Sequence, residues 1–399
     1  MSIFSTRGRL TQLFIAVLMT GVVACSGSSS SGGVKLGESC SQKDAYKIQK
    51  VETTYIRCEI VPGTSMHSTD ASQKAKFVWT ETTEAQYLLA SASNESIRID
   101  GSSTVYPLTA VAAKYFETTT KSVMGSNGVK VTVGISGTGG GFEKFCKDET
   151  DISDASRAIK PAEAESCANA GIEYTEVIIA NDGIAVVVNP KNTWAKCLTM
   201  DEMKKIWEPD STVTKWSQVR DGFPDTPIKL FGAGTDSGTF DAFTEFVNGK
   251  GGVVRKEAVQ TSEDDNVTVR GIQSETGAMG YFGLSYAIEN STTVMAIQLD
   301  NGSGCIDPTV ETVQAYTYPM ARPLFIYVKN ESVTTKPAIG AFVQFYVDNL
   351  KQISEDALFV PLTDEQINSL VAFLDKDFPK RTPPVHTAAG PDGGAVHPK

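Results

Sequence analysis

The same local pattern occurs three times in this chain: a short run rich in β-branched residues, then a loop of Gly, Ser and Thr, then a helical pattern. The loops are 101–106 (GSSTVY), 136–141 (SGTGGG) and 232–239 (GAGTDSGT). Strands that alternate with helices are typical of α/β proteins. The alternation extends from 96 to 378, which is long for one domain and fits two. We therefore predict an α/β fold with two domains.

The residues beside each loop predict where the helices begin and end. Pro107 opens a helix that runs through Phe116, because a proline at the first helical position lacks only an N–H that would have no partner there. The second helix is expected to begin at Phe142, after the glycines. The third presents one apolar face from Phe240 to Val247.

Such loops suit the binding of a small oxyanion. The first N–H groups of a helix have no partner within the helix, and the helix dipole places about half a positive charge there. Glycine lets a ligand approach the backbone, and hydroxyl groups add donors. A weaker fourth copy at 151–157 contains Arg157, the one basic residue in the four loops. We expect Arg157 either to bind the anion or to form a surface salt bridge, and each Ser or Thr can also be an ordinary N-cap.

The charge of the chain limits its partners. The formal net charge is −11, with 36 basic and 47 acidic residues. Removing residues 1–24 takes away Arg7 and Arg9 and no acid, which leaves 34 − 47 = −13. An acidic body argues against nucleic acid, which requires basic patches. It permits a small anion, because local dipoles can bind one inside an acidic protein.

Motifs for catalysis are incomplete. The segment 236–239 (DSGT) resembles an aspartic-protease motif, but that chemistry needs a second carboxylate motif and none occurs. The loop 136–141 lacks the lysine of a phosphate-binding P-loop. The three histidines, His67, His386 and His397, lie outside all four loops. The serines of the loops therefore lack the histidine that acts as general base in a serine hydrolase. We expect no enzyme, no cofactor and no metal site.

The first 25 residues have the pattern of an export signal. Arg7 and Arg9 precede an apolar stretch at 10–23, which is too short for a comfortable membrane span. The following Val22–Cys25 segment (VVAC) resembles the lipobox of bacterial lipoproteins, which implies cleavage after residue 24 and lipidation of Cys25. The alternative is an uncleaved anchor helix. We predict an exported protein, periplasmic or at the cell surface, held to a membrane by acyl chains.

Six further cysteines suggest disulfide bonds, since an even number in an exported protein is typical of paired cysteines. Six cysteines allow 15 connectivities. The pair Cys40–Cys58 is isolated at the N-terminal end and is the firmest expectation. The other two pairs that we expect are Cys146–Cys167 and Cys197–Cys305.

The segments outside the α/β pattern differ in composition. Residues 25–33 form the expected lipidated cysteine and a flexible tether of Ser and Gly. Residues 34–95 form a small accessory region in which 76–80 is a strand candidate, and the sequence assigns this region no function. Residues 379–399 are rich in Pro and Gly and are expected to be disordered.

Five segments are similar to the phosphate-binding proteins of bacterial phosphate ABC importers. They are 101–108 (GSSTVYPL), 134–146 (GISGTGGGFEKFC), 150–159 (TDISDASRAI), 232–246 (GAGTDSGTFDAFTEF) and 264–287 (DDNVTVRGIQSETGAMGYFGLSYA). The resemblance spans about 97–350 in the order of the family. The combination of SGTGGG, ASR and GTDSGT resembles the cyanobacterial-type branch.

The resemblance implies a periplasmic-binding-protein fold, in which two α/β lobes are joined by two crossover strands and enclose a ligand cleft. The crossovers would be 177–188 and 324–328. Lobe I would then comprise 96–183 plus 321–378, and lobe II would comprise 184–320.

The resemblance also implies which residues contact the anion. These are Ser103, Thr104, the backbone of Val105, Ser136, Thr138, Ser156, Arg157, Ser237, Gly238 and Thr239.

Two positions depart from the family pattern. Many members have an aspartate where this chain has Ser156, and that aspartate accepts the proton that distinguishes hydrogen phosphate from sulfate. Many also have an arginine where this chain has Ala233. Arg157 can supply a bidentate guanidinium from the other lobe. Asp236 and Asp154 are the candidate proton acceptors.

The function implied is reversible binding of inorganic phosphate by a monomer that delivers it to the membrane subunits of an ABC importer. The alternative is a phosphate-sensing or general oxyanion-binding lipoprotein that is not coupled directly to transport. The unassigned region 34–95 motivates this alternative.

Overall fold

The structure, a computed structural model, describes most of the chain between residues 34 and 378. The described residues are 34–82 with gaps at 42, 44–47, 52–53, 63 and 65–70, and then 95–124, 128–235, 237–255, 259–262, 264–376 and 378. The predicted signal segment 1–24, Cys25, the tether up to residue 33 and the tail 379–399 lie outside the described residues.

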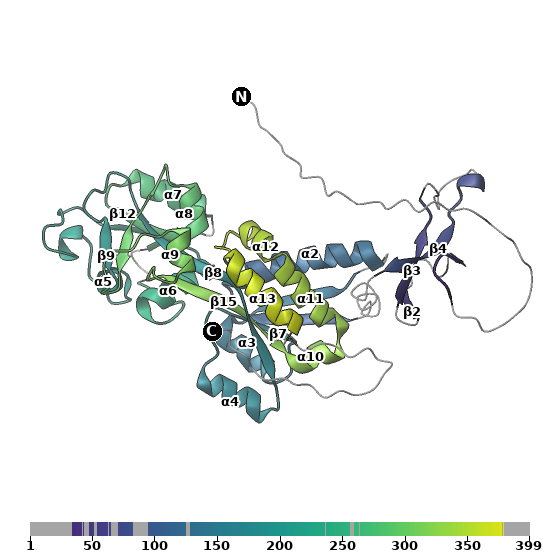
Figure 1. Ribbon diagram of the computed structural model, residues 1–399. Coiled ribbons are helices and arrows are strands. Elements are labelled where there is room, and N and C mark those ends of the chain that lie inside the picture. Colours follow the sequence, from purple (N-terminus) through teal and green to yellow (C-terminus); the bar gives the residue numbers. More distant parts are fainter. Residues whose placement is uncertain are drawn as a thin grey trace, which may run out of the picture.

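A mixed sheet runs through the α/β body (Figure 1), with the strands in the order β11-β10-β12-β8-β15-β7-β5-β6 and with β13 also paired to β8. Its strands are β5 (Ser96–Gly101), β6 (Lys130–Ile135), β7 (Ile152–Ala155), β8 (Tyr174–Val188), β10 (Lys229–Ala233), β11 (Val259–Ser262), β12 (Ala278–Gly283), β13 (Met295–Ala296) and β15 (Ala321–Lys329). A two-stranded parallel sheet joins β9 (Cys197–Thr199) to β14 (Gln298–Asp300).

Strand β8 belongs to both halves of this sheet. Its residues from Tyr174 to Gly183 pair antiparallel with β15, and those from Ile184 to Val188 pair antiparallel with β12. The half that contains β15, β7, β5 and β6 is called lobe I here, and the half that contains β12, β10, β11 and β13 is called lobe II. Both halves carry parallel pairs, β5 with β6 and β7, and β10 with β11 and β12.

Helices cover both faces of the lobe I sheet (Figure 1). On one face Phe116, Phe342 and Tyr346 pack into a single apolar core, and on the other face Phe142 packs edge-on against Tyr327 at 4.8 Å between ring centroids. The helices are α2 (Tyr106–Met124), α3 (Gly137–Phe145), α4 (Pro161–Asn169), α10 (Asn330–Thr335), α11 (Pro337–Asp348), α12 (Leu350–Asp356) and α13 (Asp364–Lys376).

Lobe II has its own aromatic core. The rings of Phe243 and Tyr281 stack at 3.7 Å, and Trp207 packs edge-on against both. All three side chains are buried. The helices of this lobe are α5 (Met200–Trp207), α6 (Gly238–Asn248), α7 (Asp265–Ser274), α8 (Leu284–Glu289) and α9 (Val310–Gln314), together with the 3-10 turn η3 (Trp216–Gln218). A second 3-10 turn, η2 (Ala71–Gln73), precedes the α/β body.

A separate antiparallel sheet lies N-terminal to the α/β body (Figure 1), in the order β1-β4-β3-β2. Its strands are β1 (Ser39–Cys40), β2 (Ile48–Val51), β3 (Thr54–Ile60) and β4 (Phe77–Thr82). Ile56, Cys58, Phe77 and Trp79 are buried together in a core of their own. We call this the N-terminal sheet.

Two predicted helix boundaries are wrong. Helix α2 continues past Phe116 to Met124. Helix α3 begins at Gly137 rather than at Phe142, so the glycine loop forms its first turns. A Cβ on Gly141 would lie 2.6 Å from Gly101 Cα. The glycines therefore let the helix pack closely on β5, and this packing overrides their low helix propensity.

The six cysteines form the three predicted disulfides, Cys40–Cys58, Cys146–Cys167 and Cys197–Cys305. The third closes a loop with a sequence separation of 108 within lobe II. No helix in the described part of the chain is long and apolar enough to cross a membrane.

Replacing Cys197 and Cys305 together by Ser should lower the free energy of unfolding by about 2–4 kcal/mol, because the bond restricts a long loop of the unfolded chain. Chemical denaturation of the oxidised proteins measures this change. The same double replacement at Cys40 and Cys58, in the N-terminal sheet, should leave the unfolding of the α/β body unchanged. Equal effects of the two variants would contradict the expectation.

Candidate anion-binding site

The first loop is held between β5 and α2 by contacts that leave no room for a side chain at its start. Gly101 has a φ of 152°, and a Cβ there would lie 2.1 Å from the Asp154 carbonyl oxygen. The Ser102 N–H donates to the same oxygen at 2.9 Å. The next residues, Ser103 and Thr104, therefore stand at the start of α2, where its helix dipole is positive.

The second and fourth loops meet within lobe I. Thr138, in the first turn of α3, accepts from the Ser156 N–H at 3.1 Å, and the two hydroxyl oxygens are also 3.1 Å apart. Ser136 donates to the Asp100 carboxylate instead. Of the predicted hydroxyls in these loops, Thr138 and Ser156 therefore form a pair, while Ser136 is held by Asp100.

Arg157 follows Ser156 and forms a bidentate ion pair with Glu163, at 2.7 and 2.8 Å. The side chains are 23% and 21% exposed, so the pair is largely covered. Burial alone would raise the pKa of Glu163, but the Arg157 guanidinium outweighs this and holds the pKa below its usual value. The guanidinium also lies near Gly139 of α3, where a Cβ would be 3.8 Å from it. Arg157 therefore lies beside the second loop, and the Glu163 carboxylate balances its positive charge.

The third loop meets the first across the two lobes. Ser237 caps α6 and accepts from the Thr239 N–H at 3.2 Å. Thr104 donates to the Gly238 carbonyl at 3.0 Å, and a Cβ on Gly238 would lie 2.5 Å from Thr104 Cα. Only a glycine therefore allows this approach of lobe II to lobe I.

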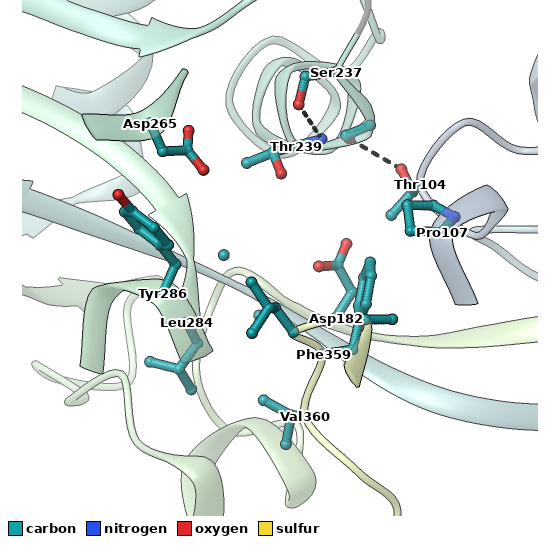
Figure 2. Close-up of a pocket in the computed structure, with 15 residues that line it drawn as sticks. Thr104, Pro107, Asp182, Ser237, Thr239, Asp265, Leu284, Tyr286, Phe359 and Val360 are labelled. Carbon is teal, nitrogen blue, oxygen red and sulfur yellow. Dashed lines mark hydrogen bonds between the residues drawn. The ribbon is translucent and has the colours of Figure 1, made fainter. Parts of the chain in front are cut away.

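A cavity of about 200 Å³ adjoins this contact. Figure 2 shows Thr104 and Pro107 on one side of it and Asp265 and Tyr286 on the other, with Thr239 at the start of α6 above them. The lining comprises Thr104, Pro107, Asp182, Gly183, Ser237, Gly238, Thr239, Asp265, Gly283, Leu284, Tyr286, Ala357, Leu358, Phe359 and Val360. Four of the ten residues predicted to bind the ligand therefore line one cavity.

The two candidate proton acceptors differ in what the structure describes. Asp236 lies outside the described residues. Asp154 is fully buried, accepts from Thr109 at 3.0 Å, and its second oxygen has no hydrogen-bond partner among the described residues. Burial raises the pKa of Asp154 to about 8. Its role as a proton acceptor stays a prediction.

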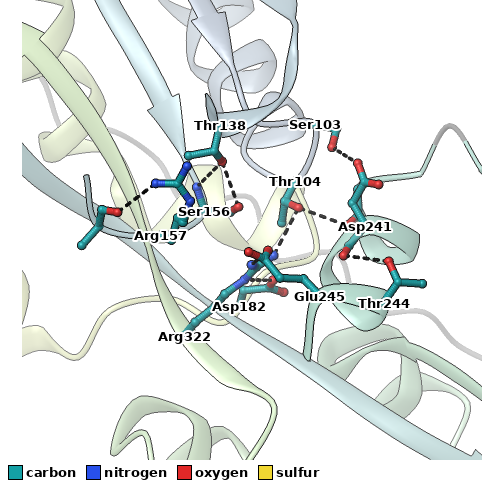
Figure 3. A network of polar contacts seen from close by, with 12 residues as sticks. Ser103, Thr104, Thr138, Ser156, Arg157, Asp182, Asp241, Thr244, Glu245 and Arg322 are labelled. Carbon is teal, nitrogen blue, oxygen red and sulfur yellow. Dashed lines mark hydrogen bonds and ion pairs between the residues drawn. The ribbon is translucent and has the colours of Figure 1, made fainter. Parts of the chain in front are cut away.

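The loop pattern did not reveal three charged residues of the cleft. Arg322, on β15, contacts Asp182 of β8 at 3.1 Å and Glu245 of α6 at 2.7 Å. Its third nitrogen lies 3.4 Å from the Thr104 hydroxyl (Figure 3). Burial raises the pKa of Asp182, although Arg322 opposes the shift. The sequence feature that could have indicated Arg322 is its position as a single charged residue at the start of the otherwise apolar segment 321–328.

The fold and this site define a two-lobed α/β binding protein, with crossover strands between the lobes and helix N-termini directed at the cleft. The chain belongs to the family described as PBP superfamily domain, whose model matches residues 69–349. This family and its fold are the ones expected from the sequence. The match begins inside the region 34–95. The last residue of that region, Glu95, contacts lobe I, because its carboxylate accepts from the Ala338 N–H of α11 at 3.1 Å.

Curated relatives and a solved structure agree with this assignment. The chain is 44% identical over 281 residues to protein SphX of Synechocystis, across 70% of this chain and 82% of that protein. It is 33% identical over 289 residues to the phosphate-binding protein PstS of Staphylococcus saprophyticus, across 71% and 87%. The crystal structure of a possible phosphate binding protein from Planctomyces limnophilus matches with a TM-score of 0.66 and 41% identity, covering 70% of this chain and 97% of that one. The likeness to SphX supports the cyanobacterial-type branch.

Replacing Asp154 by Asn should remove a pH dependence of stability. The unfolded carboxyl has a pKa of about 3.9, whereas that of the folded protein is about 8. Between these values the folded protein holds one more proton, so its stability falls as the pH rises, by up to about 1.4 kcal/mol per pH unit. Denaturation of both proteins between pH 4 and 8 measures the difference in slope. Parallel profiles would show that Asp154 is ionised in the folded protein.

Proposed function

We propose that this protein binds inorganic phosphate in the cleft between its lobes and delivers it to the membrane subunits of a phosphate ABC importer. The observation that carries the proposal is the meeting of the predicted loops. Thr138 pairs with Ser156 in lobe I, and Thr104 meets the capped start of α6 in lobe II. The names of the relatives, which include phosphate-binding proteins, support the choice of ligand.

The chemistry of these loops suits phosphate. Hydroxyls and helix N-termini supply donors and partial positive charge without a net positive site. A hydrogen bond to a charged group contributes about 1.5–3 kcal/mol. Four or five of them reach about −8 kcal/mol, near micromolar affinity, after the cost of binding is subtracted.

Binding would shift the protein toward the closed cleft, because the anion contacts both lobes only in that state. No bond in the ligand is made or broken, so we propose a receptor without catalysis. We further propose that the protein is monomeric, is exported, and is anchored through lipidated Cys25. The lipobox-like segment at 22–25 supports the anchor.

Isothermal titration of the chain from residue 34 onward with phosphate, and then with sulfate, tests the proposal. We expect tight binding of phosphate and no response to sulfate, because a proton acceptor other than the family's aspartate would select hydrogen phosphate. Comparable binding of both anions would reduce the function to general oxyanion binding. No binding of phosphate would refute the proposal.

Replacing Arg157 by Ala should weaken phosphate binding at least tenfold, because a charged hydrogen bond contributes about 1.5–3 kcal/mol. Thr239→Val should have a smaller effect, since a neutral hydroxyl contributes about 0.5–1.5 kcal/mol. Titration calorimetry measures both. The matched control is Arg220→Ala, which removes an arginine that also pairs with a single glutamate, Glu202, but stands outside the loops. Unchanged affinity in Arg157→Ala would assign Arg157 to a purely structural ion pair.

A further inference from the structure

Helix α6 carries two carboxylates that contact lobe I. Asp241 accepts from the Ser103 hydroxyl at 2.7 Å, and Glu245 pairs with Arg322 at 2.7 Å. The two acids are four residues apart, so they share one face of the helix. Figure 3 shows Asp241 directed toward Ser103 and Glu245 directed toward Arg322. Lobe II therefore touches lobe I through two side-chain contacts in addition to the Thr104–Gly238 contact.

Arg322 is held in one orientation at the centre of these contacts. Its side chain is 12% exposed, and its Nε contacts Asp182, the residue opposite it in the β8–β15 register. The guanidinium lies over the Phe246 ring, 5.2 Å from the ring centroid. One terminal nitrogen then reaches Glu245, and the other lies 3.4 Å from the Thr104 hydroxyl. The planar fork of arginine suits this three-way contact, which a lysine could not reproduce.

We propose that Glu245 and Arg322, together with Asp241 and Ser103, form an interlobe latch that stabilises the closed cleft and so sets the affinity for its ligand. Glu245 belongs to lobe II, whereas Arg322 and Ser103 belong to lobe I. When the lobes separate, both contacts break. Glu245 and Arg322 are positioning residues, because they hold α6 and Thr104 together and need not touch the anion.

The burial of Arg322 distinguishes its ion pairs from those between two exposed side chains. Asp182 is 4% exposed and Arg322 12%, while Glu245 is 39% exposed. Exposed pairs contribute little because water and salt screen them. The Lys215–Asp225 pair has the same 2.7 Å length, lies within lobe II, and is 46% and 69% exposed. Replacing Asp225 by Asn therefore removes one carboxylate from an ion pair of the same length without removing a contact between the lobes.

The link to affinity follows from the populations of the two states. The apparent dissociation constant equals the intrinsic constant divided by the fraction of protein that is competent to bind. A latch that holds the cleft closed raises the population of the closed form, both with and without ligand. Removing it should therefore open the free protein and weaken binding together.

Small-angle X-ray scattering of the ligand-free chain tests the structural part of the proposal. Glu245→Gln should increase the radius of gyration, and Asp241→Asn should do so to a smaller extent. Asp225→Asn should leave it unchanged. This measurement uses no ligand, so it stands even if phosphate proves not to be the ligand. Identical scattering for Glu245→Gln and the unmodified protein would overturn the latch.

Titration with inorganic phosphate tests the second part, which rests on the proposed function. We expect Glu245→Gln to raise the dissociation constant about threefold to tenfold, and saturating phosphate to return its radius of gyration to that of the unmodified protein. Asp225→Asn should bind as the unmodified protein does. An open Glu245→Gln variant with unchanged affinity would overturn the link to affinity. Failure of the unmodified protein to bind phosphate would refute the proposed function instead.

Discussion

The change of partner within strand β8 determines the architecture of this protein. Up to Gly183 the strand pairs with β15, and from Ile184 it pairs with β12, so one continuous backbone belongs to both halves of the mixed sheet. A Cβ on Gly183 would lie 2.6 Å from the Val313 side chain, which shows how closely α9 packs at this junction. The two lobes are therefore connected by a strand that is itself part of both cores, and the cavity lies beside the point where this strand passes from one lobe to the other.

The cleft relies on backbone groups more than on net charge. The body is acidic, and the one arginine in the loops, Arg157, is already paired with Glu163. Helices α2, α3 and α6 each begin beside a Gly, Ser or Thr loop, and the start of α6 reaches the start of α2. Fixed peptide dipoles attract an anion at short range without making the surface basic. An acidic protein can thus hold a small anion while it repels larger polyanions.

Carboxylates accept hydrogen bonds from several donors in and beside the cleft. Asp100 accepts from Ser136, Asp241 accepts from Ser103, and Glu245 accepts from Arg322. The largely buried guanidinium of Arg322 needs acceptors, and Asp182 and Glu245 provide them. Two of these contacts, Ser103 with Asp241 and Arg322 with Glu245, also join the two lobes.

The sequence by itself determined the features that depend on neighbouring residues. The strand–loop–helix pattern identified the α/β class and placed the starts of α2 and α6 close to where they lie, and the three expected disulfide pairs, chosen among 15 possible connectivities, are present. Only the tertiary structure decided the start of α3, because its glycines become helical when they pack on Gly101. It alone placed Arg322 beside Thr104, across 218 residues of sequence, and buried Asp154. Local patterns report the preferences of the backbone, whereas the partner of a charged side chain is set by which strands and helices the whole fold brings together.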